Sequence, residues 1–284
     1  MRRRRIMWLG VFGVAGAIAA SGCGSSAHAG SGASSAHMQQ VVSYTLRSKD
    51  THGVRHETAV VTGSSGHGRG LLILLPGRSG TGGATHSFAG SSTKVPLAAL
   101  ADRAPVIVGV DGGGSSYFHD RASGDWGSYV VDEVIPDAIR RFHTDPQRIA
   151  IGGDSMGGFG ALDIARLHRS RFCAVGVREP AILRSGGESA AGSFDSATDF
   201  ARHDLIASVV ANPNLYGSIP LWIDHGDYDA FVPGDNVFIA ALRRGRTPLT
   251  VHVWPGEHGG GYTSRHEDTY LNFMANALEH CHGK

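Results

Sequence analysis

The chain of 284 residues has little of several features that would point to particular classes of protein. Its 3 cysteines are too few for a small secreted fold that depends on disulfides. Its net charge is only +1, and nothing in the sequence suggests the basic face of a nucleic-acid-binding protein. Its apolar N-terminal run, residues 6–20, is too short and glycine-rich to favour a permanent transmembrane helix. A phosphate-binding loop and a convincing dinucleotide-binding motif are also absent.

What the chain does have is an ordinary globular composition. Hydrophobic residues make up 41% and charged residues 18%, and the length allows one large domain with a substantial core. No repeat of 20 to 50 residues is visible. We therefore predict one folded domain over residues 39–284.

Residues 1–23 predict a signal for export. Four arginines at positions 2–5 precede the apolar run, and no acidic residue occurs before Cys23. The Ala-Ser-Gly-Cys sequence that ends at Cys23 resembles a bacterial lipoprotein box, in which Cys23 is lipidated. Such a box usually has Leu or Val where Ala20 stands, so cleavage after a small residue is the alternative. We expect an exported protein, either secreted or attached to the membrane through Cys23, with residues 24–38 as a flexible Gly/Ser/Ala/His linker.

Beyond the linker, apolar runs typical of strands alternate with runs at helical spacing. The predicted strands cover residues 41–48, 56–62, 70–75, 105–110, 148–151, 172–177, 221–223 and 250–254, and the predicted helices cover residues 126–142, 159–169, 236–244 and 266–280. Residues 183–216 are polar with little periodicity, and we expect them to cross the active-site face with some helix. This alternation predicts the α/β class, with a mostly parallel central sheet and helices on both faces.

The chemistry is indicated by residues 153–157, which read Gly-Asp-Ser-Met-Gly. A buried strand precedes this pentapeptide and a helix follows it, the setting of the nucleophile elbow of α/β-hydrolases. The tight turn between them requires small residues beside Ser155. Its hydroxyl would stand at a helix N-terminus, where free N–H groups favour developing negative charge.

The partners of such a serine follow in the order acid, then histidine. After the strand at 221–223 come three aspartates. Asp229 has the reach expected of an acid on a loop, Asp227 is the alternative, and Asp224 would cap or order the loop. His258 lies on a glycine-rich loop after the strand at 250–254 and is the predicted base. His225 is the reserve candidate for the base, although we expect it to be a packing residue of its loop.

These residues predict an acyl-transfer site. His258 would take the proton of Ser155, and Asp229 would fix the tautomer of the imidazole. The oxyanion would be bound by the backbone N–H of Met156 and by that of Arg78, in the loop that follows the strand at 70–75.

With these pieces together, the chain resembles the esterase-D-like branch of the α/β-hydrolases, which includes S-formylglutathione hydrolases, feruloyl esterases and the antigen 85 mycolyltransferases. The similarity runs from about Leu71 to the C-terminus. It is carried by residues 106–117, which begin Val-Ile-Val-Gly-Val-Asp-Gly-Gly, by 126–136, Trp-Gly-Ser-Tyr-Val-Val-Asp-Glu-Val-Ile-Pro, and by 148–161 around the pentapeptide. The resemblance implies the α/β-hydrolase fold and a Ser-Asp-His esterase. It also implies that Trp126 packs under the active-site wall.

Two departures from the family narrow the expected activity. An antigen 85 protein has Asp-Gly-Leu-Arg where residues 76–79 here are Pro-Gly-Arg-Ser, so the resemblance argues against mycolyl transfer to trehalose. The glutathione-thioester branch is mainly cytosolic, which disagrees with an export signal. We therefore expect an exported serine esterase of small-molecule esters. The alternatives are an acyltransferase of the antigen 85 type and a non-catalytic, cell-wall-binding lipoprotein on the same fold.

The remaining residues add few expectations. With Cys23 lipidated, Cys173 and Cys281 are left either to form a disulfide or to stay free thiols. We predict no metal and no organic cofactor. The sequence of residues 183–216 does not identify the acyl chain or the leaving group of the substrate.

Overall fold

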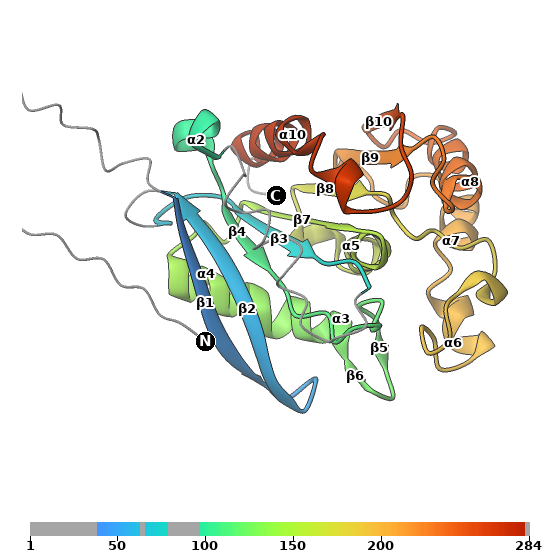
Figure 1. Ribbon diagram of the computed structural model, residues 1–284, viewed down its shortest axis with the longest axis horizontal. Helices are drawn as coiled ribbons and strands as arrows, with labels where there is room; N and C mark the ends of the chain where they lie inside the picture. The colour runs from blue at the N-terminus through green and yellow to red at the C-terminus, as the bar shows by residue number, and fades with distance from the viewer. Residues whose placement is uncertain (1–38, 63–65, 79–96, 282–284) are drawn as a thin grey trace, which may run out of the picture. The chain divides into compact units, whose positions relative to one another are not determined.

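A central sheet organises the protein in the computed structural model, which describes residues 39–62, 66–78 and 97–281 (Figure 1). Among these residues the sheet has eight strands in the order β1-β2-β4-β3-β7-β8-β9-β10. β1 and β2 form an antiparallel hairpin, and β2 pairs antiparallel with β4. The remaining neighbours, β4, β3, β7, β8, β9 and β10, are parallel to one another. The strands are β1 (Gln39–Ser48), β2 (Gly53–Thr62), β3 (Leu71–Leu75), β4 (Val106–Gly109), β7 (Ile149–Asp154), β8 (Ala174–Arg178), β9 (Leu221–Gly226) and β10 (Leu249–Trp254), with a small separate hairpin of β5 (Asp120–Arg121) and β6 (Gly124–Asp125).

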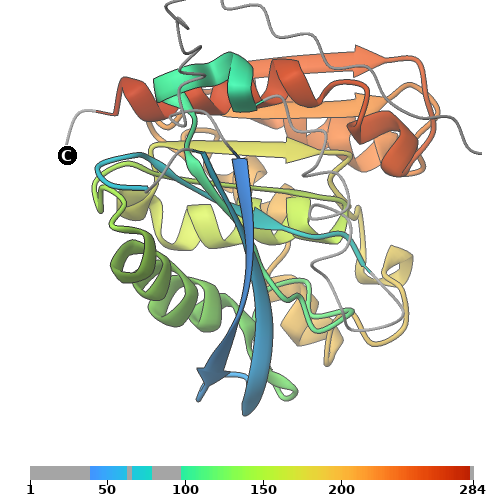
Figure 2. The same ribbon diagram turned by 60° about the vertical axis from the view of Figure 1, so that its left-hand side comes forward.

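Helices cover both faces of this sheet. Figure 2 shows α2 and α10 on one side of the strands and α4 and α5 on the other. The helices are α2 (Leu97–Leu100), α3 (Trp126–Ser128), α4 (Ile135–Phe142), α5 (Met156–Leu167), α6 (Ala197–Arg202), α7 (Leu205–Ala211), α8 (Val232–Leu242), α9 (Gly260–Thr263) and α10 (Glu267–Glu279). The predicted α/β class and mostly parallel sheet are confirmed, and the arrangement is the α/β-hydrolase fold.

The two faces have separate apolar cores because successive residues of a strand point to opposite sides. In β3, Leu71, Ile73 and Leu75 belong to the core on the α5 side. Leu72 and Leu74 belong to the core that also contains residues of α2 and α10. All five are buried, and burying one such side chain stabilises the fold by roughly 1.5–3 kcal/mol. This explains why β3 is a continuous apolar run.

Several predicted helix boundaries are wrong by a few residues. α5 begins at Met156 rather than at residue 159, and α8 begins at Val232 rather than at 236, with a proline in its first turn. The predicted helix over 126–142 contains a π-helical segment, Tyr129–Val134, before α4. Pro136 lies in the first turn of α4, directly after the π-helical segment, and has no N–H to donate into it; the carbonyl oxygen of Val131 accepts a hydrogen bond from Nη2 of Arg171 at 3.2 Å.

Residues 183–216 contain α6 and α7, as expected for a segment with some helix. The loop between β4 and α3 holds this segment through Arg121. Its Nη1 donates to the carbonyl oxygens of Gly192 at 2.8 Å and Ser193 at 2.7 Å, and its Nη2 lies 2.7 Å from a carboxylate oxygen of Asp195.

The predicted signal and linker, residues 1–38 with Cys23, lie outside the described residues. All of the residues that the structure describes belong to one compact unit, Ser34–Lys284. In the parts of the chain that the structure describes, no helix is long and apolar enough to cross a membrane.

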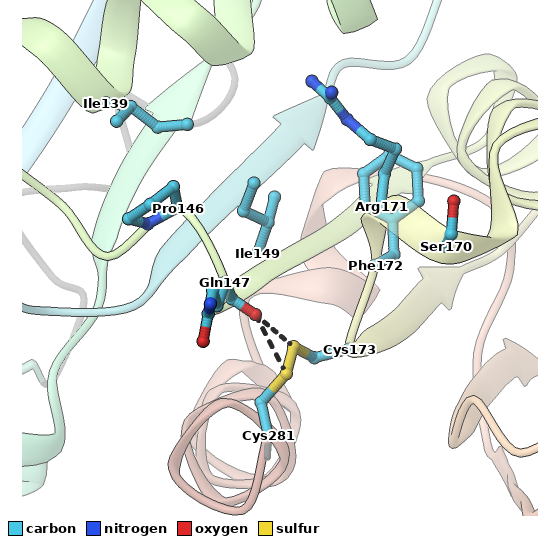
Figure 3. Close-up of a pocket in the computed structure, with 9 residues that line it drawn as sticks. All are labelled: Ile139, Pro146, Gln147, Ile149, Ser170, Arg171, Phe172, Cys173 and Cys281. Carbon is cyan, nitrogen blue, oxygen red and sulfur yellow. Dashed lines mark hydrogen bonds between the residues drawn. A yellow bond between two sulfur atoms is a disulfide. The ribbon is translucent and has the colours of Figure 1, made fainter. Parts of the chain in front are cut away.

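Cys173 and Cys281 form a disulfide, with their Cα atoms 5.6 Å apart. The bond joins the residue before β8 to the chain just after α10, at the edge of the sheet where the parallel strands begin. Figure 3 shows it beside a pocket of about 240 Å³, where both sulfur atoms lie 3.2 Å from the carbonyl oxygen of Gln147. It closes a loop with a sequence separation of 108 residues.

The connection from β7 to α5 is sterically tight. A Cβ atom on Gly157 would lie 1.9 Å from the carbonyl oxygen of Leu75, and one on Gly153 would lie 2.5 Å from the same oxygen. Between these glycines Ser155 has φ 54°, in the left-handed region that residues with a side chain rarely adopt. Only glycine at position 157 lets α5 begin this close to β3.

We predict that Gly157→Ala is strongly destabilising, because the contact is with backbone atoms that cannot rotate away. The expected loss in the free energy of unfolding is at least about 1–3 kcal/mol, the range for overpacking. Gly187→Ala is the matched control, since its nearest neighbour would be the Ser185 Oγ at 3.7 Å. Urea denaturation of both variants makes the comparison, and equal stabilities would contradict the account.

The disulfide generates a second prediction. In protein that lacks residues 1–23, Cys173→Ser with Cys281→Ser should lower the free energy of unfolding by about 2–4 kcal/mol, because the unfolded chain is no longer cross-linked. The wild-type protein under reducing conditions should match the double variant in urea denaturation. Two titratable thiols in the unreduced, denatured wild type would contradict the bond.

Candidate active site

The predicted site residues meet where the parallel strands end, because the carboxyl ends of parallel strands share one edge of the sheet. Ser155 follows β7, Asp229 follows β9 and His258 follows β10. The Nε2 atom of His258 lies 2.8 Å from Ser155 Oγ, and its Nδ1 lies 2.7 Å from Asp229 Oδ2. The three side chains therefore form one continuous hydrogen-bonded chain.

The backbone of Ser155 is held on both sides. Its N–H donates to the carbonyl oxygen of Arg178 at 3.1 Å, and its own carbonyl oxygen accepts the N–H groups of Phe159 at 3.0 Å and Ala181 at 2.9 Å. These bonds connect the turn to the helix that it begins and to the end of β8. They hold the left-handed conformation that exposes the serine hydroxyl.

Of the two candidate acids, Asp229 is the one that reaches the histidine. Its side chain is fully buried, and its second oxygen accepts the N–H of Phe231 at 2.8 Å. Asp227 instead accepts the N–H of Gly256 at 2.9 Å and ties the β9 loop to the β10 loop. The ring of Phe231 packs edge-on against His258 at a centroid distance of 5.1 Å.

The two predicted oxyanion donors belong to the residue after the serine and to the loop after β3. Met156 is the first residue of α5, so its N–H has no acceptor within the helix. Gly77 passes close to the serine, because a Cβ atom on it would lie 3.5 Å from Ser155 Cβ. Arg78 follows directly and is exposed, while the rest of its loop, from Ser79, lies outside the described residues.

A buried ion pair supports the residue before the serine. Arg178 at the end of β8 is 2% exposed, and its guanidinium makes two bonds to the Asp154 carboxylate, at 2.8 and 3.1 Å. Paired bonds of this kind fix orientation as well as charge. The guanidinium also lies 4.7 Å from the ring centroid of Tyr270.

The sequence analysis missed Glu179, which follows Arg178 and is 2% exposed. Both of its carboxylate oxygens accept the N–H of Gly259, at 3.2 and 3.1 Å, and Gly259 is the residue after His258. Burial raises the pKa of Glu179 to about 7, against the lowering effects of the Gly259 N–H and of His258. The sequence feature that could have identified Glu179 is the pair of charged residues directly after the predicted apolar strand at 172–177, at the edge of the sheet where the site forms.

Opposing effects act on the pKa of His258. Burial lowers it, whereas the hydrogen bond and charge of Asp229, followed by the charges of Glu179 and Asp154, raise it. Together the raising effects exceed that of burial, so the pKa of His258 lies above its usual value. An imidazole in this position is a good proton acceptor. It becomes fully protonated as the pH falls through that raised pKa.

Two clusters bring three metal-ligating side chains together among the described residues. In the first, Glu179, Asp229 and His258, both nitrogens of the histidine have hydrogen-bond partners. In the second, His119 contacts Asp199 at 3.1 Å, and its buried Nδ1 has no partner among the residues that the structure describes. His203 contacts Asp163 at 2.7 Å.

A metal-bound histidine normally donates its other N–H to an acceptor. Because the described residues offer no acceptor to Nδ1 of His119, the second cluster fits a hydrogen-bonded contact between segments better than a metal site.

Two residues that were expected to pack do so. Trp126 is buried beneath the loop after β4, since a Cβ atom on Gly113 would lie 2.1 Å from its ring, and the Arg55 guanidinium lies 4.6 Å from its ring centroid. His225 is 1% exposed, and its Nδ1 lies 3.0 Å from the carbonyl oxygen of Gly226.

Comparison with known proteins identifies the family of the chain. Residues 57–273 match the family described as "Putative esterase". S-formylglutathione hydrolase of Mus musculus is 28% identical over 160 residues, which cover 51% of this chain and 57% of that protein. The chain thus matches little more than half the length of this curated relative.

Solved structures share the fold. An S-formylglutathione hydrolase from Agrobacterium tumefaciens has a TM-score of 0.72 at 20% identity, over 86% of this chain and 97% of that chain. MPT51 (FbpC1) of Mycobacterium tuberculosis has a TM-score of 0.69 at 14% identity, over 84% and 99%. The resemblance drawn from the sequence is confirmed at the level of the family: the chain belongs to the family described as "Putative esterase" and has the α/β-hydrolase fold.

Proposed function

We propose that the protein is a serine esterase that hydrolyses small carboxylic esters through an acyl-enzyme on Ser155. The observation that carries the proposal is the hydrogen-bonded chain from Ser155 Oγ through His258 to the buried Asp229. Family membership supports the reaction class, and the hydrogen bonds support the individual roles.

In the first half-reaction, His258 Nε2 accepts the proton of Ser155 as Oγ attacks the ester carbonyl carbon. The negative charge forms on the carbonyl oxygen, which the backbone N–H groups of Met156 and Arg78 would bind. Each donor of this type stabilises the transition state by roughly 3 kcal/mol. His258 then gives its proton to the departing alkoxide, and the acyl group stays on Ser155.

In the second half-reaction, water attacks the acyl-enzyme and gives its proton to His258. The tetrahedral intermediate collapses, the proton returns to Ser155 Oγ, and the carboxylic acid leaves. Asp229 orients the imidazole and stabilises its protonated form in both half-reactions. Its burial and its bond from the Phe231 N–H favour one fixed orientation of the histidine.

We also propose that residues 1–23 direct export and that Cys23 is lipidated. The arginines, apolar run and small residues before Cys23 support this, and so does the Cys173–Cys281 disulfide, because disulfides persist in oxidising compartments.

Replacing the nucleophile tests the proposed function. Ser155→Ala should abolish detectable hydrolysis of a short p-nitrophenyl ester, a loss of roughly 10⁶-fold when a unit of this type is broken. Initial rates with the wild type and the variant measure this, with unchanged thermal unfolding as the check on folding. Full retention of hydrolysis in Ser155→Ala would show that the chemistry lies elsewhere.

The two aspartates of the β9 loop provide a matched pair. Asp229→Asn should lower kcat by a factor of the order of 10⁴, because an amide can stabilise the wrong tautomer of His258 and no imidazolium. Asp227→Asn should keep most of the activity, since its amide oxygen can still accept the N–H of Gly256. Initial rates of p-nitrophenyl ester hydrolysis measure both variants, and equal losses of kcat in the two would reject Asp229 as the acid.

A further inference from the structure

The carboxylate of Glu179 lies behind the loop that carries His258 and has no part in the three-residue chain. Its oxygens hold the N–H of Gly259 at 3.2 and 3.1 Å, one residue beyond the histidine. One of its oxygens, one of Asp229 and a ring nitrogen of His258 all lie within 4.8 Å of one another. A second buried carboxylate therefore faces the imidazole.

The backbone holds Glu179 in this place at a conformational cost. Its φ is +46°, in the left-handed region, although it is not a glycine and a proline follows it. Its N–H donates to the carbonyl oxygen of Asp224 at 2.6 Å. A residue in this conformation persists only where its surroundings fix it, and such residues gather at functional sites.

Other charged groups surround this carboxylate. His258 and Asp229 face it from the loops after β10 and β9, and Asp154 from the end of β7, where the Arg178 guanidinium pairs with it. Asp235 of α8 is fully buried, and among the described residues neither of its oxygens has a hydrogen-bond partner. Burial, followed by the charges of Asp229 and Glu179, raises the pKa of Asp235 well above its usual value. That shift favours the uncharged form of Asp235, and Asp229 and Glu179 are the two carboxylates whose charges act most strongly on the imidazole.

We propose that Glu179 is a positioning residue for His258: its carboxylate anchors the base-carrying loop through Gly259 and supplies a second negative charge to the imidazolium. The proposal rests on the proposed function, because it assumes that His258 is the base. It extends that function by assigning two carboxylates to one histidine, Asp229 through the ring Nδ1 and Glu179 through the backbone and through space.

The charge has a definite effect on the pH dependence. His258 acts as a base only when neutral, and a negative charge nearby favours its protonated form. The charge of Glu179 therefore moves the acid limb of the kcat/KM profile to higher pH. Because Glu179 and His258 interact, the wild-type limb belongs to the pair rather than to either residue.

Two variants separate the anchor from the charge. Glu179→Gln keeps an oxygen for the Gly259 N–H and removes the charge, so its acid limb should move to lower pH by roughly one unit, the low end for a charge within ~4–6 Å. Glu179→Ala also removes the acceptor and should lose about 10- to 100-fold in kcat at the pH plateau, because the base is no longer held in place. Gln should restore most of that kcat.

The control is Glu257→Gln. Glu257 directly precedes His258 in the sequence and its side chain is exposed, so this variant also removes one negative charge, but from a solvated position. Its acid limb should stay close to that of the wild type, because water screens an exposed charge. Profiles of kcat/KM against pH for a neutral p-nitrophenyl ester, with thermal unfolding of every variant, make the comparison.

A Glu179→Gln profile that superimposes on the wild type, or a Glu179→Ala variant with wild-type kcat, would overturn the proposal. If neither variant folds, an NMR titration of the His258 ring in the wild type tests the proposal. Two coupled titration steps would support an interacting Glu179–His258 pair, and a single step would overturn the proposal. Absence of ester hydrolysis in the wild type, or full hydrolysis by Ser155→Ala, would instead reject the proposed function itself.

Discussion

The structure depends on one steric contact, the approach of the first turn of α5 to the end of β3. Gly157 has no room for a side chain because the Leu75 carbonyl oxygen occupies the space. With strand and helix this close, the residue between them cannot take an ordinary conformation, and Ser155 adopts φ 54°. The same contact places Ser155 directly before the first turn of α5, and Gly77, two residues after β3, comes close to the serine.

The parallel register of the sheet then brings the partners to this point. β9 and β10 pair in register from Leu221 to Gly226, so the loops after them leave the sheet side by side. Backbone bonds join the two loops, from Asp227 N to the Trp254 carbonyl oxygen at 2.9 Å and from Tyr228 N to that of Gly256 at 3.0 Å. The acid and the histidine are thus held by one joined pair of loops rather than by two independent ones.

The sequence is most informative where a local pattern fixes a local structure. The pentapeptide around Ser155, with a strand before it and a helix after it, is such a pattern, and the alternating apolar runs gave the sheet and its covering helices. The helix starts at 156 and 232 were missed because glycine and proline usually mark boundaries, whereas here they lie inside the first turns.

Contacts between distant segments were not readable in this way. Asp227 and Asp229 are two residues apart on one loop, and contacts with the β10 loop distinguish them: Asp227 accepts the N–H of Gly256, whereas Asp229 reaches His258. Glu179 acquires its place from Gly259, which is 80 residues away. The pairing of Cys173 with Cys281 depends on how α10 packs against β8, which no local pattern encodes.

The electrostatic picture follows from burial around the histidine. Asp229 and Glu179 both sit in places that water barely reaches, and their charges outweigh the effect of burial on the imidazole. The central claim is that this environment activates Ser155 to form an acyl-enzyme. Acid-quenched mass spectrometry after rapid mixing with a p-nitrophenyl ester tests it most directly. The account predicts one acyl group, located on the peptide that contains Ser155, and an acyl group on any other residue, or none during turnover, would contradict it.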